Sequence, residues 1–147
     1  MNKLLIFTFF LLYMPAVSSP KLGVTVGYPY LGIKYNFLEN FALEFRSAVD
    51  YDIRVFVGRF YWNFKKFERL NVFMGFECGY IDFVSYDIKG DGYETSVFLG
   101  GEYFIFPKLS FNIDFSPTLI GVKSGRYEVS GVEFVLNLGL NFYFLSR

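Results

Sequence analysis

The sequence predicts an all-β fold: an eight-stranded antiparallel up-and-down transmembrane β-barrel with its apolar face outward. Apolar and polar residues alternate along most of the chain, as in 109–116 (LSFNIDFS), and in a strand this places the apolar side chains on one face. Aromatic residues make up 23 % of the chain, more than one small core encloses. After Pro20 no apolar run reaches the roughly 18 residues of a transmembrane helix, which leaves a closed barrel as the way to span lipid.

The first 18 residues are expected to be a signal peptide. Lys3 supplies a positive charge, Leu4 to Tyr13 form an uninterrupted apolar run, and Ala16-Val17-Ser18 places small residues before the cleavage point. The apolar run is too short to cross a bilayer as a helix. We therefore expect export and a single barrel domain over residues 19–147.

The first three strands are expected over 22–28, 30–37 and 41–49, because each alternates apolar residues with small or polar ones. Strands one and two are rich in glycine and meet at Pro29, where the missing N–H group costs least. Because these two strands are short, the strand count stays open by one hairpin.

The fourth strand, 53–64, contains two arginines of opposite parity. Arg54 and Arg59 cannot both point into a barrel unless a bulge lies between them. We predict that Arg59 is inside, because this choice places Trp62 and Phe64 on the lipid side near a membrane interface.

Two long connections separate the last four strands. These strands are expected over 71–84, 94–106, 109–119 and 132–144. The segments Ser85–Tyr93, with an Asp-Gly turn signal, and Gly121–Gly131 are expected to be loops. Long loops on one side and brief turns on the side of the termini match the asymmetry of an outer-membrane barrel.

Charged residues at inward positions form the candidate site. An eight-stranded barrel is just wide enough for side chains to fill, so buried charges there must pair or accept hydrogen bonds. We expect Arg46 and Arg59 to bridge the surrounding carboxylates, while Gly75, Gly79 and Gly100 make room for long neighbours. The predicted lumen charge network comprises Lys34, Glu44, Arg46, Arg59, Glu77, Glu102, Asp114 and Glu133.

These patterns resemble the small eight-stranded outer-membrane barrels of Gram-negative-type bacteria, the group that contains the outer-membrane protein A transmembrane domain. The last-strand stretch 138–144 (LGLNFYF) carries the resemblance, although the chain continues to Leu145-Ser146-Arg147 where the family usually stops at the aromatic residue. The resemblance implies insertion in outer-membrane lipid and recognition of the last strand, Val132 to Phe144, by the barrel-assembly machinery.

The residue types argue against most enzymatic functions. The chain has no histidine, the usual base in hydrolysis and acyl transfer near pH 7, and the barrel enzymes that it resembles in architecture depend on one. No phosphate loop, zinc spacing or calcium loop is present, so we expect no catalytic residue, metal or cofactor. Equal numbers of basic and acidic residues, 14 each, exclude a strongly basic surface for nucleic acid. The single cysteine, Cys78, lies at an apolar position and forms no internal disulfide.

Three functional hypotheses follow. The favoured one is a non-enzymatic outer-membrane barrel, plugged by its charges, with a structural or surface-contact role through Ser85–Tyr93 and Gly121–Gly131; its surface partner is unknown. A narrow ion-conducting pore would use the same charges as a gate. A soluble exported carrier of an apolar ligand, similar to lipocalins, would instead turn its apolar face inward and its charges outward.

Overall fold

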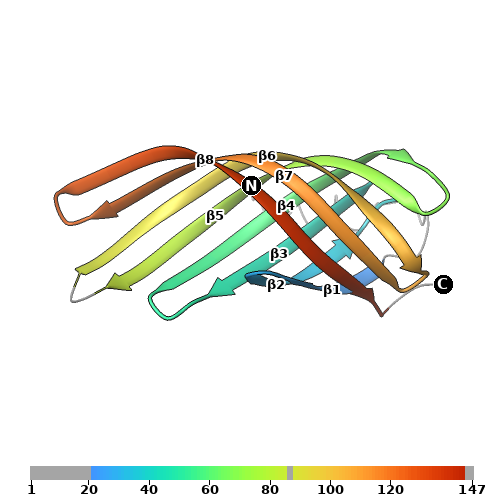
Figure 1. Ribbon diagram of the computed structural model, residues 1–147, viewed down its shortest axis with the longest axis horizontal. Coiled ribbons are helices and arrows are strands. Elements are labelled where there is room, and N and C mark those ends of the chain that lie inside the picture. The colour runs from blue at the N-terminus through green and yellow to red at the C-terminus, as the bar shows by residue number, and fades with distance from the viewer. Residues whose placement is uncertain (1–20, 86–87, 145–147) are drawn as a thin grey trace, which may run out of the picture.

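The computed structural model describes residues 21–85 and 88–144. Its strands are β1 (Lys21–Gly27), β2 (Tyr30–Asn36), β3 (Phe41–Val49), β4 (Ile53–Lys66), β5 (Leu70–Ser85), β6 (Ile88–Phe106), β7 (Leu109–Ser124) and β8 (Tyr127–Tyr143). Each strand is antiparallel to the next, and β8 pairs with β1, so the sheet closes into a barrel (Figure 1). The predicted eight-stranded up-and-down barrel is confirmed. The expected signal peptide, 1–18, and the tail 145–147 lie outside the described residues.

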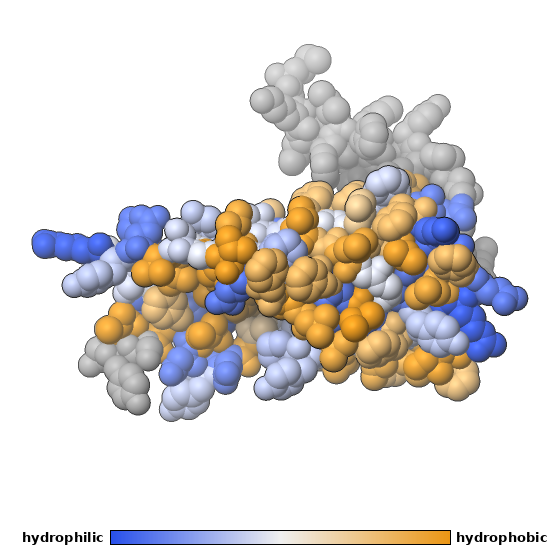
Figure 2. All heavy atoms as spheres, turned by 45° about the horizontal axis from the view of Figure 1, so that its top comes forward, coloured by the Kyte–Doolittle hydropathy of each residue, from blue (hydrophilic) through white to orange (hydrophobic). Residues whose placement is uncertain are grey.

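Side chains alternate between the lumen and the outer surface. Along β7, Asn112 and Asp114 are buried in the lumen, whereas Phe111 and Ile113 are exposed outside. Hydrophobic residues cover much of the outer surface, and hydrophilic residues gather toward the two ends (Figure 2). The apolar face is therefore outward, as a barrel in lipid requires. Within the described residues no helix has the length and hydrophobicity to span a membrane.

β4 adopts the predicted parity. Arg59 is 1 % exposed in the lumen, whereas Arg54 is exposed, and Trp62 lies on the outer surface. The register with β5 shifts between Asn63 and Lys65, near the end of the strand, and is regular between the two arginines. Arg59 is thus inside without a bulge separating it from Arg54.

Both predicted long loops are mostly strand, which corrects the expectation for Ser85–Tyr93 and Gly121–Gly131. β6 pairs with β5 from Ile88 onward, and β7 pairs with β8 out to the pair Ser124 and Tyr127. The turn between β7 and β8 contains Gly125 at φ 57°, a conformation that favours glycine. Toward the hairpin ends the strands no longer alternate regularly between apolar and polar residues. Their glycines and charged residues therefore indicated loops in the sequence.

The barrel wall has unequal height. β1 and β2 have 7 residues each and β3 has 9, whereas β4 has 14 and β6 has 19. β1 pairs with β8 only from Gly139 to Tyr143, so no strand in the described part of the chain pairs with the other edge of Tyr127–Leu138. The hairpins β5–β6 and β7–β8 project past the β1–β2 hairpin at one end of the barrel (Figure 1). β1 begins and β8 ends at the opposite end, which we call the side of the termini. We call the unpaired Tyr127–Leu138 edge of β8, which extends beyond the β1–β2 turn, the lateral gap.

The outward orientation of Leu138 can be tested by substitution. Leu138 lies on the outer face of β8, midway between Val132 and Phe144. Leu138→Arg should lower the free energy of unfolding by about 2–4 kcal/mol, because the guanidinium would lie near the middle of the lipid. Ser130→Arg, on the same face near the hairpin end, should cost at most about 1 kcal/mol. Urea unfolding in lipid vesicles, followed by the fluorescence of Trp62, measures both, and equal costs would contradict the assigned orientation.

Candidate functional site

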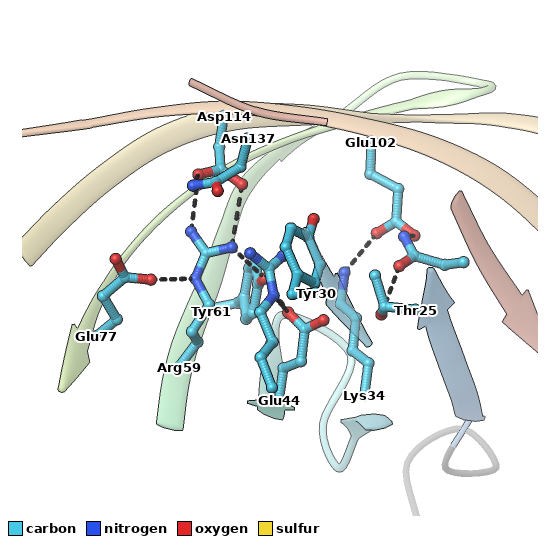
Figure 3. Close-up of polar contacts among 12 residues, drawn as sticks. Thr25, Tyr30, Lys34, Glu44, Arg59, Tyr61, Glu77, Glu102, Asp114 and Asn137 are labelled. Carbon is cyan, nitrogen blue, oxygen red and sulfur yellow. Dashed lines mark hydrogen bonds and ion pairs between the residues drawn. The ribbon is translucent and has the colours of Figure 1, made fainter. Parts of the chain in front are cut away.

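The lumen gathers seven of the eight charged residues that the sequence predicts. Each of the seven is at most 7 % exposed, and strands β2 to β7 contribute them. They are Lys34, Glu44, Arg46, Arg59, Glu77, Glu102 and Asp114. Figure 3 labels all of these residues except Arg46 and shows the labelled side chains reaching inward from different strands toward one another. Inward parity on each strand and closure of the barrel together bring them into contact.

Arg59 is the centre of the larger cluster. Its Nη2 lies 2.8 Å from Asp114 Oδ1 and its Nη1 lies 3.1 Å from Asp114 Oδ2, a two-point pairing that matches the planar guanidinium. Its Nε lies 2.8 Å from Glu77 Oε2. Asn137 Nδ2 donates to Asp114 Oδ1 at 2.9 Å, so the cluster joins β4, β5, β7 and β8.

Tyr61 connects this cluster to a second arginine. Its hydroxyl oxygen accepts hydrogen bonds from Arg59 Nη1 at 3.0 Å and Arg46 Nη2 at 3.1 Å, and its hydroxyl donates to Glu44. Arg46 Nε also lies 3.0 Å from Glu44 Oε2. The sequence reasoning did not single out Tyr61; its parity with Arg59, two residues away, was the available signal.

Glu102 organises a second cluster on the side of the termini. Lys34 Nζ lies 2.9 Å from Glu102 Oε2, and the other carboxylate oxygen accepts hydrogen bonds from Asn141 at 2.8 Å and from Ser110 and Tyr143 at 2.5 Å. Lys34 Nζ also lies 4.5 Å from the centre of the Tyr61 ring, a cation–π contact that links the two clusters.

An aromatic layer packs beside the charges. Tyr61, Phe73 and Phe98 form a buried cluster with ring centres 4.9–6.0 Å apart in edge-to-face contact. The Arg59 guanidinium lies 3.8 Å from the centre of the Phe98 ring. A Cβ atom at Gly75 would come within 2.5 Å of that ring, so only glycine fits. At Gly75 and Gly79 the long side chains of Phe98 and Glu94 occupy the space, as predicted, whereas at Gly100 the nearest atoms are the backbone and Cβ of Ile113 and Asp114 on the neighbouring strand.

Glu133 does not join the network, contrary to its prediction. Its parity is inward, but it lies on the part of β8 beyond β1 and is exposed. Glu94, an inward, half-buried carboxylate of β6 that the sequence reasoning omitted, instead lines the lumen at this end together with Glu77. The alternation of apolar and polar residues identifies whether a side chain points into or out of the barrel, but not where it lies along the barrel axis.

The two clusters separate two mouths of the barrel. A cavity of about 320 Å³ on the side of the termini ends at Glu102 and Tyr143. A cavity of about 190 Å³ on the opposite side ends at Arg46 and Glu77. Among the described residues, no group of histidine, cysteine, aspartate and glutamate has an arrangement that could hold a metal ion.

These features define the chain as an eight-stranded β-barrel with an apolar exterior and an ion-paired lumen. Among solved structures, it is similar to the crystal structure of the N-terminal β-barrel domain of Pseudomonas aeruginosa OprF, with a TM-score of 0.56 and 11 % sequence identity. The similarity covers 85 % of this chain and 95 % of that one. No family model and no curated protein matches the chain. The resemblance to small eight-stranded outer-membrane barrels is thus confirmed at the level of the fold.

The central role of Arg59 predicts a large cost for its removal. Arg59→Gln should lower the free energy of unfolding by about 3–5 kcal/mol, because Glu77 and Asp114 would stay buried without their cation. Arg54→Gln, an exposed position on the same strand, is the matched control and should change it by no more than about 0.5 kcal/mol. Adding Asp114→Asn to Arg59→Gln should recover part of the loss. Urea unfolding in vesicles measures all three variants, and similar costs for the two arginines would exclude the central role.

Proposed function

We propose that this chain is a non-enzymatic integral protein of the bacterial outer membrane whose lumen is plugged by charged side chains. The observation that carries the proposal is the pairing of Arg59 with Glu77 and Asp114 inside a barrel with an apolar exterior. Similarity of the fold to the barrel domain of OprF supports the location. In this proposal residues 1–18 direct export, and Val132 to Phe144 carry the signal for the assembly machinery.

The distribution of charge argues against a soluble carrier of an apolar ligand. Such a carrier needs an apolar interior and a polar exterior. Here the lumen holds Lys34, Arg46 and Arg59 with their carboxylates, whereas Leu31 and Phe134 are 60 % and 72 % exposed on the outside. Lipid, rather than water, is the solvent that suits this surface.

The plug is favoured over the pore because its charges are neutralised in place. Arg59 contacts two carboxylates and the Tyr61 hydroxyl, so an ion could pass only after several of these interactions break together. Separating buried charges from their partners is costly. The Phe73 and Phe98 rings fill further space at this level of the lumen.

A surface role would belong to the projecting hairpins. In the segments Ser85–Tyr93 and Gly121–Gly131, most of the described residues belong to paired strands, so they form the surface of a β-hairpin rather than free loops. Tyr93 and Tyr127 are 63 % and 82 % exposed there. Exposed tyrosines with charges of both signs suit contact with another protein.

Membrane location predicts a distinct behaviour on fractionation. The mature protein should sediment with outer membranes, resist extraction at high salt or alkaline pH, and migrate differently in SDS gels before and after boiling. The last effect is expected because a closed barrel keeps its hydrogen-bonded wall in cold detergent. Recovery in the soluble periplasmic fraction would exclude the membrane assignment.

A plugged lumen predicts negligible conductance in planar bilayers. The wild-type protein should carry no steady ion current, since the Arg59 and Lys34 clusters lie across the lumen. Deleting residues 86–92 and 123–128 to shorten both hairpins should leave assembly and conductance unchanged. A steady current through the intact protein that is lost in Arg46→Gln or Arg59→Gln would overturn the plug and favour the pore.

A further inference from the structure

Two cavities adjoin each other where the barrel wall is short, beside the β1–β2 and β3–β4 turns. The cavity of about 190 Å³ inside the mouth and a second of about 500 Å³ beside it share four lining residues. The shared residues are Pro29, Tyr30, Ala48 and Val55. The first cavity extends to Glu77 and Glu94, and the second to Leu31 and Val49, which are exposed on the outer surface. The space is thus lined by carboxylates at one end and mainly by apolar side chains, with Asp50 among them, at the other.

The lateral gap connects this space with the surrounding lipid. β1 and β2, at 7 residues each, are shorter than the about 9–11 residues that a strand needs to cross a bilayer. Beside them, Val135 and Asn137 on the unpaired part of β8 line the inner cavity. A molecule dissolved in the outer leaflet could therefore reach the mouth from the side, over the β1–β2 turn.

The charge of the mouth selects the kind of molecule. Arg46 and Arg59 are already paired with carboxylates deeper in the lumen. Glu94 and Glu133 have no ion pair among the described residues, and Glu133 lies opposite Thr118, which lines the inner cavity. The mouth therefore has an excess of carboxylate over cation, which favours a positively charged group and opposes phosphate or carboxylate.

We propose that this mouth binds a cationic amphiphile that enters from the outer leaflet through the lateral gap. Its ammonium group lies beside Glu94 and Glu133, and its apolar tail crosses the rim at Ala48 toward Leu31 and Val49. The inference rests on the proposed membrane location, since lipid is the source from which the molecule enters. Binding at this site requires no opening of the plug, because the site lies between the mouth of the barrel and Arg46.

Binding is tested with the protein in phosphatidylcholine nanodiscs. Decyltrimethylammonium, kept below its micelle concentration, is the cationic probe, and decyl sulfate has the same tail with a negative head. Isothermal titration calorimetry, with the signal of empty nanodiscs subtracted, should show saturable binding of decyltrimethylammonium and none of decyl sulfate. Glu94→Gln with Glu133→Gln should weaken that binding by about tenfold, equivalent to ~1.4 kcal/mol.

Two further variants separate charge from shape. Glu39→Gln with Glu68→Gln removes the same charge on the side of the termini and should leave binding unchanged. Ala48→Phe fills the junction of the two cavities without altering charge and should also weaken binding. Equal binding of both probes, or unchanged affinity in both the Glu94/Glu133 and the Ala48 variants, would overturn the proposal.

The test also distinguishes the site from the membrane location. Heat-modifiable gel mobility of every variant reports whether the barrel has formed in the nanodisc. A wild-type chain that does not insert would contradict the proposed function. An inserted barrel that fails to discriminate between the probes would contradict the binding site alone.

Discussion

The buried pairing of Arg59 is the interaction on which the rest of this barrel depends. A guanidinium in a narrow lumen must be neutralised, and Glu77 on the neighbouring strand β5 and Asp114 on the more distant strand β7 do so. Through Tyr61 the same side chain reaches the Arg46–Glu44 pair on β3. The strands around the lumen must therefore keep their register, because a slip of one residue would turn these charges toward lipid.

The apolar exterior of the barrel is the complementary constraint. Polar groups that a soluble protein would place on its surface are gathered in the lumen, and the wall carries the apolar residues. At the projecting ends of the hairpins β5–β6 and β7–β8, apolar and polar residues alternate less regularly, and glycines and charged residues are present. The same two hairpins leave one edge of β8 without a partner beside the short β1–β2 hairpin.

The unequal wall gives the two mouths different characters. On the side of the termini, the cavity is bounded by Glu102, whose oxygens are occupied by Lys34 and three neutral donors. On the other side, Glu94 and Glu133 have no cationic partner among residues 21–85 and 88–144, and the cavity continues over a low apolar rim. The ion-paired clusters of the lumen thus lie between two mouths of different charge, and the binding proposed at the Glu94 mouth requires no conducting path.

The sequence by itself determined which face each residue occupies, because the two-residue period of a strand is a local property. It therefore placed Arg59 inside and Trp62 outside, and it identified seven buried charges. Only the tertiary structure decided which groups these charged side chains pair with and where each lies along the barrel axis. The Tyr61 bridge, the exclusion of Glu133 and the lateral gap depend on how far each strand is staggered against the next around the closed barrel. That stagger arises from the pairing of each strand with its neighbours and from the closure of β8 on β1, which the alternation within one strand does not encode.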